Sequence, residues 1–308
     1  MKKRSKQILS NFELILGILI ILAFAVTAIA APQIAPPEEG ESPYYLPKDG
    51  YKGIPLPPNE NHPLGTLPHQ YDIFYGLIWG TRMAFLLGLT ITLGRTLIGG
   101  LLGLTSGYFG GMLDGVVMRI TDAFMSIPAV AAAAIMYALF GEIGQMIKPD
   151  AQTLLSSRNE QIIIIALVAF GWMQYARLIR ANVMSEREKE YVHAAISLGT
   201  PRGRILFKHL LPNSIRGMLV LIASDIGAMV ATVSVFYFIG LIGNSPLGFL
   251  ADWGLMLSAS RDWIVSSANR PFEFWYTYVP AISAIVLFTV GWSMIGDGLR
   301  DVLDPRTQ

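Results

Sequence analysis

The sequence predicts an all-α integral membrane protein with six transmembrane helices. Three observations lead to this fold class: an apolar composition, six apolar stretches of membrane-spanning length, and loops that differ sharply in charge. Of the 308 residues, 53% are hydrophobic and only 15% are charged, whereas a soluble domain carries about 25% charged residues. The mean hydropathy of +0.48 agrees with a chain that resides in lipid.

Six segments are long and apolar enough to cross a bilayer, which needs roughly 20 apolar residues in a helix. They cover residues 12–31, 83–107, 122–140, 161–177, 217–242 and 276–296. The first segment follows a basic start and could instead be a cleaved signal peptide. Its uncharged run from Leu14 to Ala31 is longer than the roughly 7–15 apolar residues of a signal sequence, so we expect a retained helix.

The loop charges predict the orientation of the spans, because basic residues concentrate in cytoplasmic loops. Residues 31–81 hold two lysines against six acidic residues, a net charge of −4. Residues 177–216 hold eight basic against three acidic residues, a net charge of +5. The N-terminal stretch is also basic. We therefore expect the first loop outside, the second loop in the cytoplasm and both termini inside.

The chain reads as one membrane domain. We expect a cytoplasmic tail over residues 1–11, a first transmembrane helix over 12–31 and an extracytoplasmic loop over 32–82, whose Pro-rich and Gly-rich part to residue 68 should be irregular. A core over 83–296 then holds five transmembrane helices and the cytoplasmic loop 178–216, and residues 297–308 form a second cytoplasmic tail. Within the loop 178–216, the pattern around Gly199-Thr-Pro201 predicts a helix, a turn and a second helix.

Composition and motifs exclude several kinds of chemistry. There is no cysteine, which rules out disulfides, thiolate metal sites and cysteine nucleophiles. The four histidines lie outside the apolar segments. The sequence has no Gly-x-x-x-x-Gly-Lys-Ser/Thr phosphate loop, so this chain cannot hydrolyse ATP alone. We expect no catalytic residue, no metal and no cofactor in it.

The second half of the loop carries the most informative motif. It reads Glu190-Tyr-Val-His193-Ala194-Ala195-Ile-Ser-Leu-Gly199 and, after nine residues, ends in His209-Leu-Leu211-Pro212-Asn213. The motif resembles the signature loop of permease subunits in binding-protein-dependent ABC importers, whose pattern is Glu-Ala-Ala, three residues, Gly, nine residues and an Ile-x-Leu-Pro-like end. His193 stands where that family usually has Glu.

The resemblance implies that this loop docks on a cytoplasmic ATPase subunit. The residues expected to take part are Glu190, His193, Ala194, Ala195, Gly199, Arg202, Arg204, Leu211 and Pro212. Small side chains at the paired alanines would let a short helix around residues 194–205 approach a groove closely. Gly199 would supply a backbone conformation, or a clearance, that a Cβ opposes. The alternative is an ordinary basic surface loop between two spans.

Matches on either side of the loop narrow the family. His62-Pro-Leu-Gly65-Thr66, Gly107-Tyr-Phe-Gly-Gly111 with Asp114 and Asp122, and Gly296-Asp-Gly-Leu-Arg300 resemble C-type permease subunits of dipeptide and oligopeptide importers. Two segments depart from that pattern: the run from Leu67 to Asp72 and the last outer loop from Gly243 to Phe272. Both departures lie outside the expected spans, where they bear on the solute class more than on ATPase coupling.

What the resemblance implies is the fold of a type I ABC importer permease in the plasma membrane of a prokaryote, surrounded by the lipid bilayer. The expected partners are a second permease subunit (a B-type paralogue), two cytoplasmic ATPase subunits that hold ATP and Mg, and an extracytoplasmic solute-binding protein. No nucleic acid is expected. The solute would be a peptide or a similar small molecule, and the same family also moves nickel complexes and oligosaccharides.

Two ionisable residues lie within predicted spans, Arg95 and Asp225. At about 1.5 Å rise per residue, Arg95 lies roughly 18 Å below the outer surface and Asp225 roughly 13 Å above the inner one, at similar depth. Such residues usually face the bundle interior or a water-filled cavity. They could form a buried structural ion pair, line the solute pathway, or contact the partner permease.

Two other function classes remain open at this point. A secondary transporter or channel driven by an ion gradient would favour intramembrane carboxylates and broken helices near the midplane, and Asp225 is the only acid deep in a predicted span. An intramembrane hydrolase would need a nucleophile with its base, or metal ligands, within the bilayer. The lack of cysteine and of intramembrane histidine weighs against it.

Overall fold

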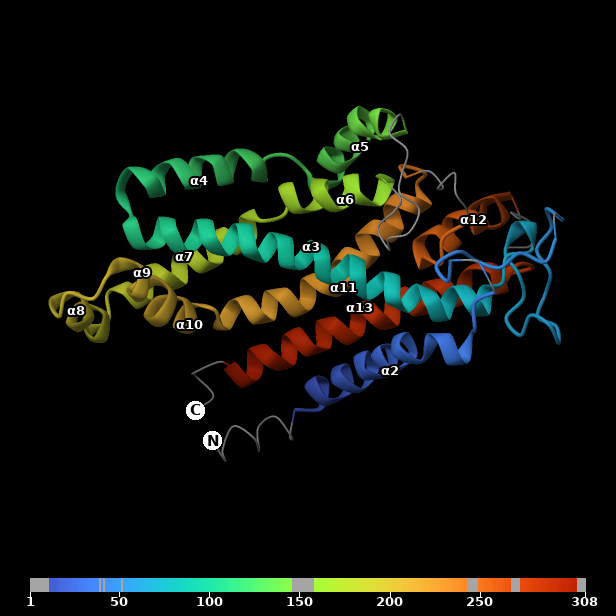
Figure 1. Ribbon diagram of the computed structural model, residues 1–308, viewed down its shortest axis with the longest axis horizontal. Coiled ribbons are helices and arrows are strands. Elements are labelled where there is room, and N and C mark those ends of the chain that lie inside the picture. The colour runs from blue at the N-terminus through green and yellow to red at the C-terminus, as the bar shows by residue number, and fades with distance from the viewer. Residues whose placement is uncertain are drawn as a thin grey trace.

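The chain forms a bundle of long helices that run side by side along its longest axis (Figure 1). The computed structural model describes residues 11–303, apart from 39, 41, 51, 146–157, 243–248 and 267–271. The helices are α2 (Phe12–Ile34), η1 (Pro68–Gln70), α3 (Ile73–Phe109), α4 (Gly111–Met125), α5 (Ala129–Gln145), α6 (Arg158–Ala169), α7 (Met173–Arg187), α8 (Glu190–Ser197), α9 (Arg202–Arg204), η2 (Ile205–Leu210), α10 (Leu211–Ser214), α11 (Arg216–Phe238), α12 (Trp253–Ser266) and α13 (Trp275–Leu303).

The described residues confirm the predicted fold class. Five helical segments are long and apolar enough to cross a membrane, and α4 with α5 adds a sixth if that bent pair is counted as one span. The five are Phe12–Ile34, Ile73–Phe109, Gln161–Arg187, Gly217–Phe238 and Trp275–Leu303. Helices α8 to α10 lie at one end of the bundle, hereafter the loop end, and α12 lies at the opposite end (Figure 1).

The third predicted span is wrong as a single helix over residues 122–140. The chain instead breaks at residues 126–128, between α4 and α5, and the two helices meet at an angle of 82°. Pro128 has no N–H for an intrahelical hydrogen bond, and its ring disfavours helical conformation in the preceding residue. The apolar run therefore continues through the break although the helix does not.

Other helix bounds also differ from the hydropathy pattern. Helix α3 begins at Ile73 rather than at residue 83, and α13 continues to Leu303, into the segment expected to be a tail. Helix α7 continues to Arg187, beyond residue 177, where the predicted fourth span ends. The added parts of α7 and α13 are rich in polar and charged residues, which hydropathy does not assign to a span, whereas the added part of α3 is apolar and is followed by Arg82.

Glycines bring α3 and α7 into close contact. Gly99, Gly103 and Gly107 recur every four residues on one face of α3, and all three are buried. A Cβ added at Gly107 would lie only 2.9 Å from the carbonyl oxygen of Arg180, and the contacts at Gly99 and Gly103 are tighter still. Small residues at this spacing let two membrane helices approach at backbone distance. Helices α3 and α7 therefore form a tightly packed pair.

Ion pairs then fasten α4 to α7. Arg180 Nη2 donates to Asp114 Oδ2 at 2.6 Å, and Arg177 pairs with Asp122. The chain reverses between α3 and α4 at Gly110 and Gly111, which have φ angles of 65° and 56°. A residue with a side chain would be strained in both positions. The motif around these two glycines thus builds one hairpin of helices against α7.

The segment that precedes α3 and the residues just before α12 meet at the end of the bundle opposite the loop end. Leu46 N donates to the Phe249 carbonyl at 2.8 Å, next to a bridge between Tyr45 and Leu250. The buried His62 ring lies between two carboxylates, with Nε2 3.0 Å from Asp49 and Nδ1 2.6 Å from Asp72. Asp72 in turn caps α3 by accepting a hydrogen bond from the Tyr75 N–H.

Candidate functional site

The short helix α8 ends in a motif that requires glycine. Thr200 N–H donates to the Ala195 carbonyl at 3.1 Å, and Gly199 N–H donates to the Ile196 carbonyl at 2.9 Å. These two bonds make a Schellman motif, in which the residue after the cap adopts a left-handed conformation. Gly199 has a φ of +72°, and an added Cβ would meet no atom within 4 Å. The glycine therefore supplies conformation and not clearance.

The helix, turn and second helix predicted around Gly199 and Pro201 are confirmed, whereas the single docking helix expected around residues 194–205 is wrong. Helix α8 stops at Ser197, and α9 begins at Arg202 after Pro201, which is the residue that precedes its first turn. The Gly199 turn and the proline separate the two helices. The docking segment is therefore a helix, a turn and a second short helix, rather than one continuous rod.

Helix α8 is anchored in the bundle by one side chain. Val192 is fully buried and belongs to a compact apolar cluster at the loop end. The other buried members of that cluster are Leu104, Tyr175, Ile179, Val183, Ile205, Leu206, Leu210 and Met218. They come from α3, α7, η2 and α11, so α8 is anchored in a cluster that also holds residues of three spanning helices.

A polar network around Tyr191 reinforces the anchor. The Tyr191 hydroxyl donates to Glu186 Oε2 at 2.8 Å and accepts from Asn213 Nδ2 at 3.2 Å. Lys189 Nζ donates to the other Glu186 oxygen at 2.5 Å. Burial, helped by the Glu186 carboxylate, raises the pKa of the Tyr191 hydroxyl, which keeps it a hydrogen-bond donor. The network joins α8 to the end of α7 and to α10.

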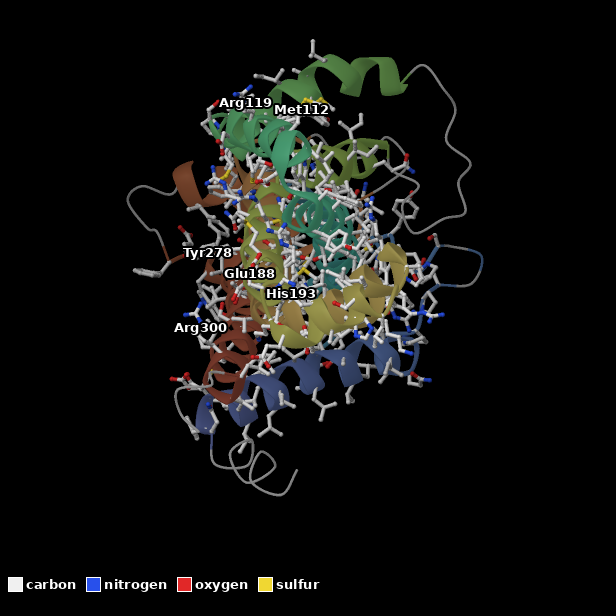
Figure 2. All side chains as sticks on the ribbon, turned by 90° about the vertical axis from the view of Figure 1, so that its left-hand side faces the viewer. Met112, Arg119, Glu188, His193, Tyr278 and Arg300 are labelled. Atoms are coloured by element: carbon white, nitrogen blue, oxygen red, sulfur yellow. The ribbon has the colours of Figure 1, made fainter. Side chains whose placement is uncertain are left out.

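The opposite face of α8 points away from the bundle. Figure 2 looks onto the loop end, where Glu188 and His193 face the viewer. Glu190, His193 and Ala194 are exposed and Ala195 is partly buried. Leu198 is 85% exposed and Phe207 is 57% exposed. Neither Leu198 nor Phe207 was among the predicted docking residues, although both lie within the loop motif and are large apolar side chains exposed to solvent.

The remaining predicted docking residues border this face. Arg202, Arg204 and Pro212 are exposed and Leu211 is partly buried. The loop end therefore presents small and large apolar side chains beside two arginines. A surface of this kind suits a partner with an apolar groove and acidic groups at its edge.

Deep in the bundle, Arg95 and Asp225 are in direct contact. Arg95 Nη1 lies 3.1 Å from Asp225 Oδ1 and 3.3 Å from Oδ2. The Tyr175 hydroxyl donates to the same carboxylate at 3.1 Å. Arg95 is buried, with 6% of its surface exposed. These contacts favour the structural ion pair, and a role in the solute pathway stays a prediction.

Arg95 also fills a break in the fourth span. Residues 170–172 form a turn between α6 and α7, where Gly171 N–H bonds to Val168 O at 3.3 Å. Arg95 Nε donates instead to the Leu167 carbonyl at 2.8 Å. In an unbroken helix the Gly171 N–H would bond to that Leu167 oxygen. Arg95 thus satisfies an acceptor that the break exposes.

The described part of the structure offers no candidate metal site. Within the described ranges, no cluster of three or more His, Cys, Asp or Glu side chains could hold a metal ion. What the geometry provides is a bundle of helices that are long and apolar enough to span a membrane, with an exposed and partly apolar surface at one end. This combination defines a multi-spanning membrane protein.

Comparison with known proteins identifies the family. The family described as "Binding-protein-dependent transport system inner membrane component" matches residues 99–308. The "Dipeptide transport system permease protein DppC" of Alkalihalophilus pseudofirmus is 33% identical over 98% of this chain and 88% of its own length. The "Probable D,D-dipeptide transport system permease protein DdpC" of Escherichia coli is 32% identical over 82% of this chain and 76% of its own.

A third relative, the "Oligopeptide transport system permease protein OppC" of Bacillus subtilis, is 29% identical over 96% of this chain and 87% of its own length. This chain belongs to the binding-protein-dependent transport permease family, as the motif resemblance predicted. It is a multi-pass inner-membrane permease subunit of an ABC importer, and not an enzyme. As a component of a binding-protein-dependent transport system, it works together with other protein chains of that transport complex.

Proposed function

We propose that this chain is one of two permease subunits of an importer of short peptides. The relatives that align along most of the chain are named as permeases for dipeptides, D,D-dipeptides and oligopeptides, which supports a peptide solute. A second permease completes the pathway, an extracytoplasmic binding protein delivers the peptide, and two cytoplasmic ATPase subunits supply the energy.

The observation that carries this proposal is that α8 is buried on one side and exposed on the other. Its inner side chain Val192 is buried in an apolar cluster that also holds residues of three spanning helices, while Leu198 and Phe207 are exposed on the same loop. An ATPase groove that holds the projecting side would move α8 when it closes on ATP. The buried anchor would pass that movement to α3, α7 and α11.

In this proposal the loop end faces the cytoplasm. The net charge of +5 over residues 177–216 and of −4 over residues 31–81 supports this orientation. The start of α2 and the end of α13 both lie toward the loop end (Figure 1), which supports cytoplasmic termini. Arg202 and Arg204 would then form charge-assisted bonds with the ATPase or meet anionic lipid.

Reconstitution of the complete system tests the proposal. The chain is produced together with a second permease, the ATPase subunits and a binding protein from the same organism, and the complex is placed in proteoliposomes. We expect the four proteins to copurify and a radiolabelled dipeptide to accumulate only with ATP and binding protein. Uptake driven by a proton or sodium gradient without ATP would overturn the proposal in favour of a secondary transporter.

A further inference from the structure

A cavity of about 860 Å³ lies between α7, α10, α11 and α13 in the half of the bundle next to the loop end. Nine of its fourteen lining residues carry amide, hydroxyl or charged side chains, while apolar groups supply the larger part of the wall's surface. Among the nine are Gln174, Asn182, Ser185, Asn213, Ser224 and Arg300. Figure 2 shows Arg300 on α13 at this end of the molecule.

The cavity reaches into membrane-spanning helices. Between Gln174 and Ser185 its wall follows α7 for roughly 17 Å, and between Gly217 and Ser224 it follows α11 for roughly 10 Å, at about 1.5 Å per residue. Side chains of this polarity are costly against lipid and face cavities or protein when they occur in spans. The wall is therefore suited to water and polar solutes.

The inner limit of the cavity lies beside the buried charge cluster. Gln174 precedes Tyr175, and Ser224 precedes Asp225, in the sequence. Tyr175 and Asp225 are bonded to each other and, through Asp225, to Arg95. The cavity thus runs from the loop end up to the point where the fourth span is broken and the ion pair closes the bundle.

We propose that this cavity is the cytoplasmic exit half of the solute path and that it binds a short zwitterionic peptide. The inference rests on the proposed function and adds the location and chemistry of a solute site. The volume falls within the roughly 300–1,000 Å³ of ligand pockets. Amide side chains both donate and accept hydrogen bonds, as a peptide backbone does, and three of them line the wall.

The charged groups of the wall determine which end of a peptide it holds. The Glu186 carboxylate is already engaged by Lys189 and by the Tyr191 hydroxyl. Arg300, on the facing helix α13, is exposed. A guanidinium pairs well with a carboxylate. Arg300 would therefore hold the C-terminal carboxylate of the peptide, while Gln174 hydrogen-bonds its amides. The side-chain nitrogens of Asn182 and Asn213 already donate within the protein, so these two residues would accept from the peptide through Oδ1.

Cysteine accessibility tests the solute site in this cysteine-free chain. Gln174→Cys is compared with Leu101→Cys in the complete complex. Leu101 is 52% exposed and lies at similar depth, because Gly99 packs on Trp172 and Gly103 on Ala176. We expect a small cationic thiol reagent to label position 174 at least tenfold faster, and alanyl-alanine to slow that labelling. Equal rates at the two positions, or labelling unaffected by the dipeptide, would overturn the proposal.

Peptide selectivity tests the role of Arg300. Uptake of alanyl-alanine is compared with uptake of alanyl-alaninamide, which lacks the carboxylate, in wild type, Arg300→Gln and Arg300→Lys. We expect Arg300→Gln to lose several-fold of the uptake rate for the free dipeptide only, with partial recovery in Arg300→Lys. If wild type transports both peptides and Arg300→Gln reduces both equally or neither, the site assignment is wrong. If wild type shows no ATP-driven uptake, the proposed function itself fails.

Discussion

The guanidinium group of Arg95 lies directly over the backbone of Gly171, in the space that any side chain at position 171 would need. Arg95 belongs to α3 and Gly171 to the break between α6 and α7. The same guanidinium bonds to Leu167 O and to Asp225. One side chain thus links the outer part of a broken span to α11, and the glycine is what gives it room.

Gly171→Ala should destabilise the protein because the new methyl group would displace the Arg95 guanidinium from its bonds. Overpacking of this kind costs about 1–3 kcal/mol. Gly115→Ala is the matched control, since a Cβ there meets no atom within 4 Å and its residue is helical. Thermal unfolding of the purified protein in detergent should show a lower midpoint for Gly171→Ala alone. Equal midpoints in the two variants would refute this packing.

Neutralising either member of the Arg95–Asp225 pair should reduce the amount of assembled protein. Arg95→Gln leaves the Asp225 carboxylate unpaired, and Asp225→Asn leaves the guanidinium unpaired; breaking a buried pair costs about 3–5 kcal/mol. The double variant should regain much of the loss, because neither charge remains. Size-exclusion chromatography measures assembly. Normal assembly of both single variants, with uptake that changes with solute charge, would instead establish the pathway role.

Hydropathy predicted the spans well where lipid contact decides the residue types, and less well where helices leave the apolar layer. The predicted span begins directly after Arg82, although the first turns of α3, from Ile73 onward, are also apolar and partly buried. Pro128 by itself indicates a helix break, but the apolar residues on both sides of it made the segment resemble one continuous span. Residue depth matched Arg95 with Asp225, yet depth alone cannot show which helices are neighbours.

The motif spacing located the loop in the sequence, but it did not show how the loop is anchored in the bundle. The positions of Ala194, Ala195 and Gly199 followed from the motif, whereas the burial of Val192 depends on residues from α3, α7 and α11. The same limit applies to the cavity. Its polar residues are scattered along four helices and carry no shared sequence pattern, so only the packed structure brings Gln174, Asn213 and Arg300 to one wall.

Orientation in the membrane can be tested by labelling from one side. Single cysteines replace Pro57, an exposed residue of the first long loop, and Thr200, in the turn after α8. We expect an impermeant thiol reagent to modify position 57 in intact cells and position 200 only after permeabilisation. Labelling of position 200 in intact cells, with position 57 protected, would reverse the proposed topology.

Stability should fall as pH rises from about 4 to about 6, in part through Asp252. This residue is buried, caps α12, and accepts from the N–H groups of Gly254 and Leu255. Burial raises the pKa of its carboxyl to about 6, above the usual value of about 3.9. In this window the unfolded chain releases the proton while the folded chain retains it, so the folded state loses stability until the pH passes about 6.

Asp252→Asn provides the control for this pH dependence. Asparagine keeps the capping oxygen but cannot ionise. The drop in unfolding midpoint between pH 4 and pH 7 should therefore be smaller in Asp252→Asn than in wild type. A drop of the same size in both proteins would show that Asp252 does not contribute to it.

The most direct test of the whole account is the affinity of the ATPase for two variants of equally exposed side chains. Leu198 in the turn after α8 is 85% exposed, and Met112 on α4 is 87% exposed and lies at the same end of the molecule (Figure 2). Leu198→Asp should weaken ATPase binding at least tenfold and abolish ATP-driven uptake, while Met112→Asp should retain both near wild-type levels. Wild-type binding and uptake in Leu198→Asp, or equal losses in the two variants, would contradict the claim that this loop couples the permease to its ATPase.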